Sequence, residues 1–231
     1  MTTTETLKPA GCATRSTMRR LFLILCLSAL PLAGFEPLPA PGPIIVPGGG
    51  DAAWQPLFVT LAAQGPIWST FTECRWFLFR KTPVILKGEL RFSPTRGLSL
   101  HYQEPEVRTI IADEKGLAMR DAGGRTHEVP SDPRVTGPTA ALLPIMRFDL
   151  RALEERFEVH AARSGPAWRL DFVSRDPVLV RALGTVIVSG EDLSVHQLEF
   201  RHSPKERVEI QIGEVRTGVN FTPEEERRFF R

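Results

Sequence analysis

Apolar and polar residues alternate with a period of two through much of the chain after residue 67. The alternation is clearest in five segments, at 86–92, 98–102, 168–172, 193–196 and 208–212. Each segment has one apolar and one polar face, as an antiparallel strand does when water covers one side of its sheet. Turn-forming residues separate the strands, at 93–97, 113–116, 122–124, 189–192 and 202–204. The pattern predicts a mainly β (α+β) domain built on one antiparallel sheet of about ten strands.

A few helices are expected beside this sheet. The first begins at Asp51 and ends at Gly65-Pro66, since an aspartate can cap free N–H groups and a glycine commonly ends a helix. Two more are expected at 138–146 and 149–157, where apolar residues recur at helical spacing. The last begins at Thr222, which is followed by a proline and three acidic residues, a typical helix start.

A sheet of this size should curl, and these helices are too few to hide its whole apolar side. A curled sheet with helices over its mouth encloses an apolar cavity. The helices over the mouth are called the lid here. The candidate residues that line the cavity and its lid are Trp54, Leu57, Phe58, Leu61, Leu90, Phe92, Leu98, Leu100, Ile111, Leu142 and Met146. The alternative is that the first four, which form one helical stripe, are core residues and that the sheet fills its concave face with its own side chains.

The N-terminal segment has the three parts of a secretory signal. Arg19 and Arg20 precede an apolar run at 21–30, and small residues follow at 31–34. The run is shorter than the roughly 20 residues that span a bilayer. We therefore expect a signal peptide with an upstream extension at 1–34, a Pro/Gly-rich linker at 35–50, a domain at 51–231, and export to the periplasm. An uncleaved membrane anchor is the alternative, and either Met1 or Met18 is the true start.

Composition and motifs argue against several classes of function. There are 29 Lys and Arg residues against 27 Asp and Glu, so the chain lacks the basic excess of a nucleic-acid binder. The five histidines are scattered, and no cysteine pair has the spacing of metal ligands. Cys74, expected in a strand beside Trp76, fits an inert thiol better than a nucleophile. We expect no catalytic residue, no metal, no cofactor and no nucleic-acid partner.

Short motifs in a fixed order suggest a family. Phe71-Thr72-Glu73 opens the strand series, and the segments 87–92, 97–105 and 109–117 follow. The C-terminal part continues with Trp168-Arg169-Leu170, a hairpin around 190–192, and Asn220-Phe221-Thr222-Pro223. Over about residues 51–223 this order resembles the LolA-like periplasmic outer-membrane lipoprotein carriers.

The resemblance implies an unclosed half-barrel of about eleven strands with amphipathic helices as a lid. It also implies a monomer whose cavity holds the acyl chains of a lipoprotein or related lipid. An inner-membrane ABC transporter would donate this cargo, and an outer-membrane acceptor would receive it. In better-known carriers an Arg-Pro pair between the second and third strands holds the lid through helix carbonyls. Here Arg96 follows Pro94 by two residues, so it is a lid-latching candidate or a plain turn arginine. A non-catalytic binding or scaffold module of the cell envelope is the alternative function.

Overall fold

The computed structural model describes residues 40–45, 51–129 and 142–231. The chain divides into two units, Met1–Glu36 and Pro37–Arg231, and all described residues belong to the second unit. The predicted signal peptide at 1–34, much of the predicted linker and residues 138–141 of the second predicted helix lie outside the described residues. None of the helices in the described ranges is long and apolar enough to cross a membrane.

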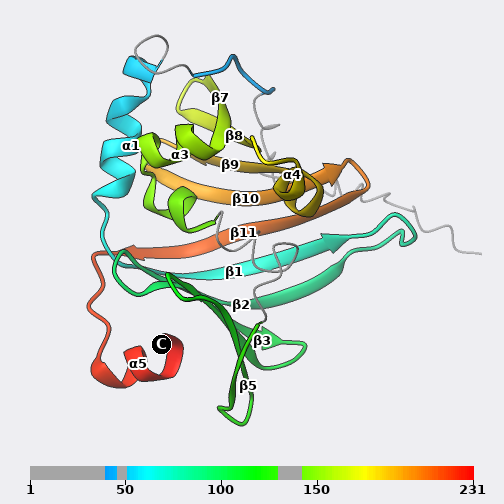
Figure 1. Cartoon of the computed structure of the whole chain (residues 1–231), viewed down its shortest axis with the longest axis vertical. Helices are drawn as coiled ribbons and strands as arrows, with labels where there is room; N and C mark the ends of the chain where they lie inside the picture. The colour runs from blue at the N-terminus through cyan, green and yellow to red at the C-terminus, as the bar shows by residue number, and fades with distance from the viewer. Residues whose placement is uncertain (1–39, 46–50, 130–141) are drawn as a thin grey trace, which may run out of the picture. The chain divides into compact units, whose positions relative to one another are not determined.

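Eleven strands form one antiparallel sheet in the described unit (Figure 1). They are β1 (Ile67–Trp76), β2 (Val84–Ser93), β3 (Gly97–Glu104), β4 (Arg108–Asp113), β5 (Gly116–Asp121), β6 (Thr126–Glu128), β7 (Phe157–Ser164), β8 (Ala167–Ser174), β9 (Thr185–Glu191), β10 (Ser194–Ser203) and β11 (Glu206–Thr217). The spatial order is β6-β5-β4-β3-β2-β1-β11-β10-β9-β8-β7. The sheet therefore consists of two meanders joined where β1 pairs with β11, and β6 and β7 are its edges. This confirms the predicted unclosed, mainly β architecture.

The helices are short. They are the 3-10 turn Asp51–Ala53, α1 (Gln55–Ala62), a helical segment at 142–147, α3 (Leu150–Arg156), α4 (Pro177–Leu183) and α5 (Pro223–Phe229). The helix α1 begins at Gln55 with Trp54 as its N-cap and no side-chain cap, so the predicted start and cap at Asp51 are wrong for it. Two other predicted caps are confirmed. The Asp149 carboxylate accepts a hydrogen bond from Ala152 N at 3.2 Å. Thr222 and Glu225 form a reciprocal capping box at the start of α5.

Helix α4 is absent from the helices that the sequence predicts. Its residues Pro-Val-Leu-Val-Arg-Ala-Leu are an apolar run with no helical period, which is equally compatible with a strand. The signals that determine it are at its two ends. The side chain of Asp176 accepts a hydrogen bond from Val178 N at 2.8 Å, and Gly184 follows the helix with a φ of 66°.

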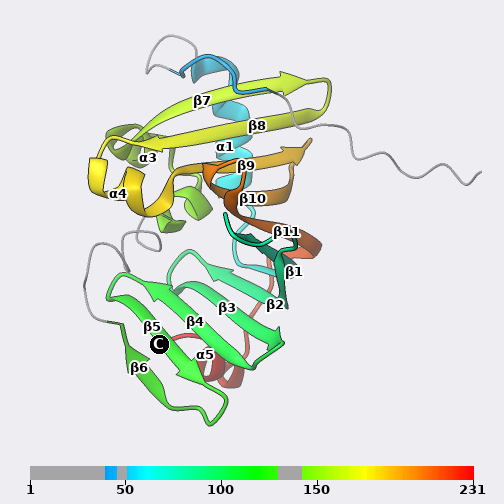
Figure 2. The same cartoon turned by 90° about the vertical axis from the view of Figure 1, so that its right-hand side faces the viewer.

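The two faces of the sheet carry different side chains. On the concave face, Leu90 lies between Ser69 on β1 and Leu100 on β3, and Leu198 on β10 lies between Val188 and Ile210. These apolar residues join Leu57, Phe58 and Leu61 of α1 in one core cluster. Helix α5 instead packs on the opposite, convex face, behind β3–β5 in Figure 2.

Part of the predicted linker pairs with an edge of the sheet. Ile45 N donates to Val159 O at 2.7 Å, and Ala161 N donates to Pro43 O at 3.0 Å. A Cβ on Gly42 would lie 1.8 Å from Ala161 O, so only glycine allows this close approach. The contact gives hydrogen-bond partners to backbone groups of β7 that would otherwise be unpaired at the edge of the sheet.

Candidate functional site: two cavities on the concave face

The first cavity lies under the end of α1 and the helical segment 142–147, and its volume is about 350 Å³. Its walls come from β1, β2 and β9–β11, and most of the lining side chains are apolar. They include Leu90, Met146, Phe148, Val188, Leu198 and Ile212. Gln64, just after α1, closes one side by donating to the Leu193 carbonyl at 2.7 Å. The size is within the roughly 300–1,000 Å³ of ligand-binding pockets.

The second cavity, of about 460 Å³, lies further along the same strands. On β11, Ile212 lines the first cavity and Ile210 lines the second. On β10, Leu198 lines the first cavity and Phe200 lines the second. The wall of the second cavity is also apolar over much of its area, with Leu100, Leu142 and Leu183 among its residues. Arg75, Trp76 and His202 add polar atoms.

A buried carboxylate lies in the wall of the second cavity. The Glu73 side chain is only 2% exposed, and it points to the concave face between apolar residues. It accepts a hydrogen bond from the Tyr102 hydroxyl at 2.6 Å and a short hydrogen bond from Arg75 Nε. These two partners compensate a charge that would be very costly to bury alone. The Arg108 guanidinium lies over the Tyr102 ring, 5.0 Å from its centre.

The local electrostatics keep Tyr102 in its neutral form. Burial raises the pKa of the Tyr102 phenol, and the neighbouring Glu73 carboxylate raises it further. Tyr102 therefore acts as a fixed hydrogen-bond donor. This cluster cannot be recognised in the sequence, because Glu73 and Tyr102 are 29 residues apart and no local pattern connects them.

The predicted lining residues fall into three groups. Leu90 and Met146 line the first cavity, and Leu100 and Leu142 line the second. Six others belong to or pack against the core cluster and line neither of these cavities: Trp54, Leu57, Phe58, Leu61, Phe92 and Leu98. The apolar stripe of α1 is therefore packed on the core, where the rings of Phe58 and Phe148 meet edge to face at 6.2 Å.

Ile111, predicted to line the cavity, lies on the convex face and lines neither cavity. It pairs with Ser99 and Ala118 on the convex side, where it is fully buried. Its neighbour Ile110 is the residue that lines the second cavity. Strand β4 carries apolar residues on both faces because the C-terminal segment covers its convex side, as the contact of Arg231 with Asp113 at 2.6 Å shows. A period of two cannot decide between two adjacent isoleucines.

Arg96 also lies elsewhere than a latch on the lid requires. Its guanidinium pairs with Glu226 of α5 at 2.9 Å, and α5 is on the convex face. Arg147, at the end of the helical segment 142–147, connects this segment to the sheet in the opposite sense, from the helix to the turns. It pairs with Glu114 at 2.5 Å and donates to the Pro94 carbonyl at 3.3 Å. It therefore connects the helical segment to two turns of the sheet.

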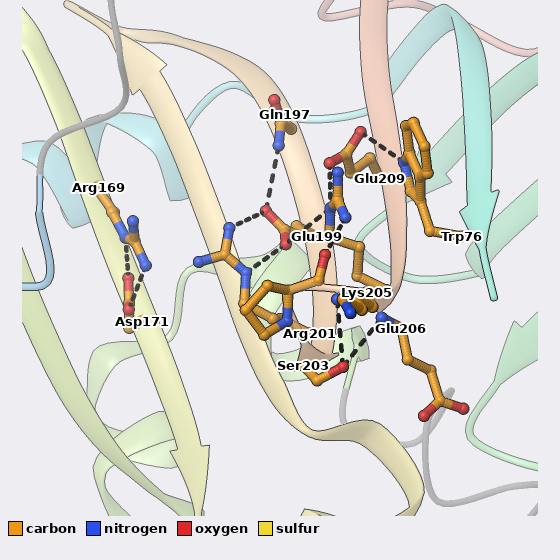
Figure 3. A network of polar contacts seen from close by, with 12 residues as sticks. Trp76, Arg169, Asp171, Gln197, Glu199, Arg201, Ser203, Lys205, Glu206 and Glu209 are labelled. Carbon is orange, nitrogen blue, oxygen red and sulfur yellow. Dashed lines mark hydrogen bonds and ion pairs between the residues drawn. The ribbon is translucent and has the colours of Figure 1, made fainter. Parts of the chain in front are cut away.

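The convex face carries a series of ion pairs, shown in Figure 3. Arg169 pairs with Asp171 at 2.5 Å, Arg201 pairs with Glu199 at 2.5 Å, and the Trp76 indole donates to Glu209 at 3.2 Å. The arginine and its acid lie two residues apart on one strand, so both face the same side. These pairs satisfy each other's charge, as structural ion pairs do.

Cys74 lies beside this convex network. Burial raises the pKa of its thiol, and the negative charges of Glu209 and Glu73 raise it further. A raised pKa favours the unreactive thiol over the thiolate. Over the ranges that the structure describes, no group of three or more His, Cys, Asp or Glu residues is placed to hold a metal ion.

A family model described as "Outer membrane lipoprotein carrier protein LolA-like" matches residues 48–213. The match spans most of the chain, so the protein belongs to this LolA-like family, and the resemblance inferred from its motifs is confirmed. A search of curated proteins gives no match.

Solved structures with a similar fold are distant in sequence. A LolA superfamily protein from Nitrosomonas europaea is 7% identical, with a TM-score of 0.43 over 74% of this chain and 96% of that chain. MucB in complex with MucA(peri) is 12% identical, with a TM-score of 0.38 over 75% of this chain and 57% of that chain. A DUF1329 family protein from Desulfovibrio piger is 9% identical, with a TM-score of 0.37 over 74% and 94%. These likenesses concern the fold alone.

Proposed function

We propose that this protein is a periplasmic carrier that shields the acyl chains of lipoproteins or related lipids in its concave face. It would move them from the inner to the outer membrane. The observation that carries this proposal is the first cavity, whose apolar walls enclose about 350 Å³ that the protein's own side chains leave unfilled. The family match, and the export signal expected at 1–34, are consistent with it.

The physical need for such a cavity follows from the chemistry of the cargo. Each methylene group buried from water is stabilised by about 0.8 kcal/mol, so an acyl chain cannot cross an aqueous compartment unaided. A carrier must also release its cargo. The wall of the first cavity offers apolar contact with few fixed polar partners, which gives affinity without a demand for one exact ligand shape.

The second candidate is a non-catalytic binding or scaffold module of the cell envelope with a self-filled core. The burial of Leu57, Phe58 and Leu61 in the core cluster favours it, because α1 then acts as a structural plug. The carrier is the better proposal, since the core cluster leaves two cavities open on the same face. An inner-membrane ABC transporter as donor, an outer-membrane acceptor and a monomeric state belong to the carrier proposal by family resemblance.

The two proposals differ in what the purified protein contains. Protein recovered from cells that export it should release acyl lipid on extraction with organic solvent, and mass spectrometry identifies that lipid.

A fluorescent fatty acid should bind the emptied protein and be displaced by lipid. Met146→Trp, which fills the first cavity, should weaken this binding about tenfold or more. Val59→Trp, on the exposed side of α1, is the matched control and should bind as the unmodified chain does. Absence of both extracted lipid and fatty-acid binding would favour the scaffold.

A further inference from the structure

The turn between β1 and β2 exposes large apolar side chains at its tip. The tip is defined here as Phe77–Lys81. Leu78 is 64% exposed and Phe79 is 85% exposed, which makes Phe79 the most exposed large apolar residue of those described. The rings of Phe77 and Phe79 stack with their centroids 5.6 Å apart. The tip therefore presents an ordered aromatic surface to solvent, which a purely structural turn does not need.

The charge of the tip indicates what this surface contacts. Arg80 and Lys81 follow the apolar residues directly, and no Asp or Glu occurs from Phe77 to Ile85. The neighbouring turn between β10 and β11 carries one residue of each sign, Lys205 and the exposed Glu206. The turn between β3 and β4 is acidic, and there Glu104 pairs with Lys87 at 3.2 Å. The positive charge is therefore gathered at the exposed apolar tip.

An apolar tip with an adjacent basic pair complements an anionic lipid surface. Aromatic and aliphatic side chains favour the boundary between headgroups and acyl chains, and Lys or Arg favour the anionic headgroups above it. A protein partner of the usual size would need a broader apolar surface than one turn offers.

The tip also lies next to the mouth of the second cavity. Phe77 and its neighbour Trp76 line that cavity. Trp76 pairs with Arg207 at the start of β11, so the turns β1–β2 and β10–β11 lie at the same end of the sheet, as Figure 1 shows. Contact of the tip with a bilayer would therefore bring the second cavity to the membrane surface.

We propose that the tip Phe77–Lys81 inserts into the headgroup region of an anionic bilayer and holds the second cavity against it for lipid transfer. The transfer step rests on the proposed carrier function, whereas insertion of the tip rests on the exposure and charge of its own residues.

The test is co-flotation of the full chain with lipid vesicles, made either of phosphatidylcholine alone or with added phosphatidylglycerol. All variants are compared in the same chain, so the N-terminal segment contributes equally to each. The unmodified chain should prefer the anionic vesicles and lose that preference at high salt. Leu78→Gln/Phe79→Gln should lower binding to anionic vesicles by about tenfold or more. Arg80→Gln/Lys81→Gln should remove most of the preference for phosphatidylglycerol.

Matched controls separate the tip from exposed residues in general. Val59→Gln changes a residue as exposed as Leu78 on α1, and Lys115→Gln/Arg151→Gln removes two exposed positive charges elsewhere. Both should bind vesicles as the unmodified chain does. Equal losses in control and tip variants would overturn the proposal, and so would an unmodified chain that does not bind anionic vesicles. The latter result would point to a protein partner for the tip.

Fatty-acid displacement without vesicles separates this proposal from the carrier function. Tip variants should keep their fatty-acid affinity, because Leu78 and Phe79 line neither cavity. If the unmodified chain binds vesicles through the tip but does not bind fatty acid, the membrane contact of the tip stands and the carrier function is rejected. If it binds fatty acid but the tip variants bind vesicles as it does, the carrier function stands and the membrane contact of the tip is rejected.

Discussion

Tyr102 on β3 donates a hydrogen bond of 2.6 Å to Glu73 on β1, and so reaches across the intervening strand β2. The residue of β2 beneath this crossing is Gly88, which pairs with both Tyr102 and Phe71. Without a side chain at Gly88, the rings of Phe71 and Tyr102 meet edge to face with centroids 5.3 Å apart. A glycine in the middle of a strand thus creates the space for a polar contact inside an apolar wall.

The titration of Tyr102 can be observed directly, since it is the chain's single tyrosine. Burial, and then Glu73, raise its pKa, so the folded protein should show no tyrosinate absorbance at a pH where the unfolded chain ionises, near about 10. The unfolded chain then binds fewer protons than the folded one. Stability should therefore fall as pH rises above about 10. Tyrosinate that forms in folded protein at the ordinary pH would contradict the buried contact.

Removal of the Tyr102 hydroxyl should destabilise the fold. Tyr102→Phe leaves Glu73 with one fewer donor in a buried site, and we expect a loss of about 1–3 kcal/mol in the free energy of unfolding, measured with denaturant. Glu73→Leu, made alone and together with Tyr102→Phe, removes the acceptor and completes a double-mutant cycle, which should be non-additive because the groups are in contact. Additive losses would mean that the two side chains do not interact in solution.

Gly88→Ala should be more harmful than a typical glycine replacement. A Cβ there would lie 2.2 Å from the His101 carbonyl oxygen and 3.0 Å from the Phe71 ring, so β2 and β3 would have to separate. We expect a loss of about 2 kcal/mol or more in the free energy of unfolding. Gly123→Ala, in an exposed turn with a side-chain neighbour at 3.3 Å, is the control and should change stability by less than about 0.5 kcal/mol. If both variants lose a similar amount of stability, the close approach of β2 and β3 at Gly88 does not require a glycine.

The sequence predicted those parts of the fold that local chemistry determines. Alternation in β2 and β3 gave the strands and their apolar face, and Asp149 and Thr222 gave two helix starts. It could not separate Ile110 from Ile111, because that choice depends on α5 and the C-terminal segment, which pack from more than 100 residues away.

The candidate site was predicted less well than the fold. Leu90, Leu100, Leu142 and Met146 do line the two cavities, since apolar residues facing a curled sheet are visible in the pattern. Which apolar residues fill the core and which leave space depends on packing volumes that a pattern does not contain. The Glu73–Tyr102 contact and the role of Arg147 depend on partners far apart in the sequence.

Phe58→Glu tests whether α1 is a mobile lid over the first cavity or a fixed part of the core. Phe58 is 2% exposed, and the charge cannot stay there without a partner, so α1 must leave the core. We expect the sheet to remain folded with a lower melting temperature, because α1 contributes only three buried side chains to a much larger core cluster. Fatty-acid affinity should be lost as the first cavity opens to water. Val59→Glu on the exposed side of α1 is the control. A Phe58→Glu chain that cannot fold would support the plug and the scaffold function.

Arg147→Gln should speed the release of bound lipid without unfolding the protein. Arg147 ends the helical segment whose Met146 lines the first cavity, and it ties that segment to Glu114 at 2.5 Å and to the Pro94 carbonyl at 3.3 Å. These contacts are partly exposed, so their loss should leave the melting temperature almost unchanged. The release rate, followed with a fluorescent fatty acid, should rise by about two- to fivefold, the factor that corresponds to a pair worth 0.5–1 kcal/mol.

Arg96→Gln is the matched control for this latch. It removes an arginine from the β2–β3 turn that Arg147 contacts through Pro94, but the partner of Arg96 is Glu226 on α5 at the convex face, away from both cavities. Its release rate should equal that of the unmodified chain. High salt should speed release from the unmodified chain and from Arg96→Gln, but have less effect on Arg147→Gln, because screening and substitution remove the same ion pair. If the two variants release lipid equally fast, Arg147 does not hold the helical segment, and the lid must be kept closed by its apolar contacts alone.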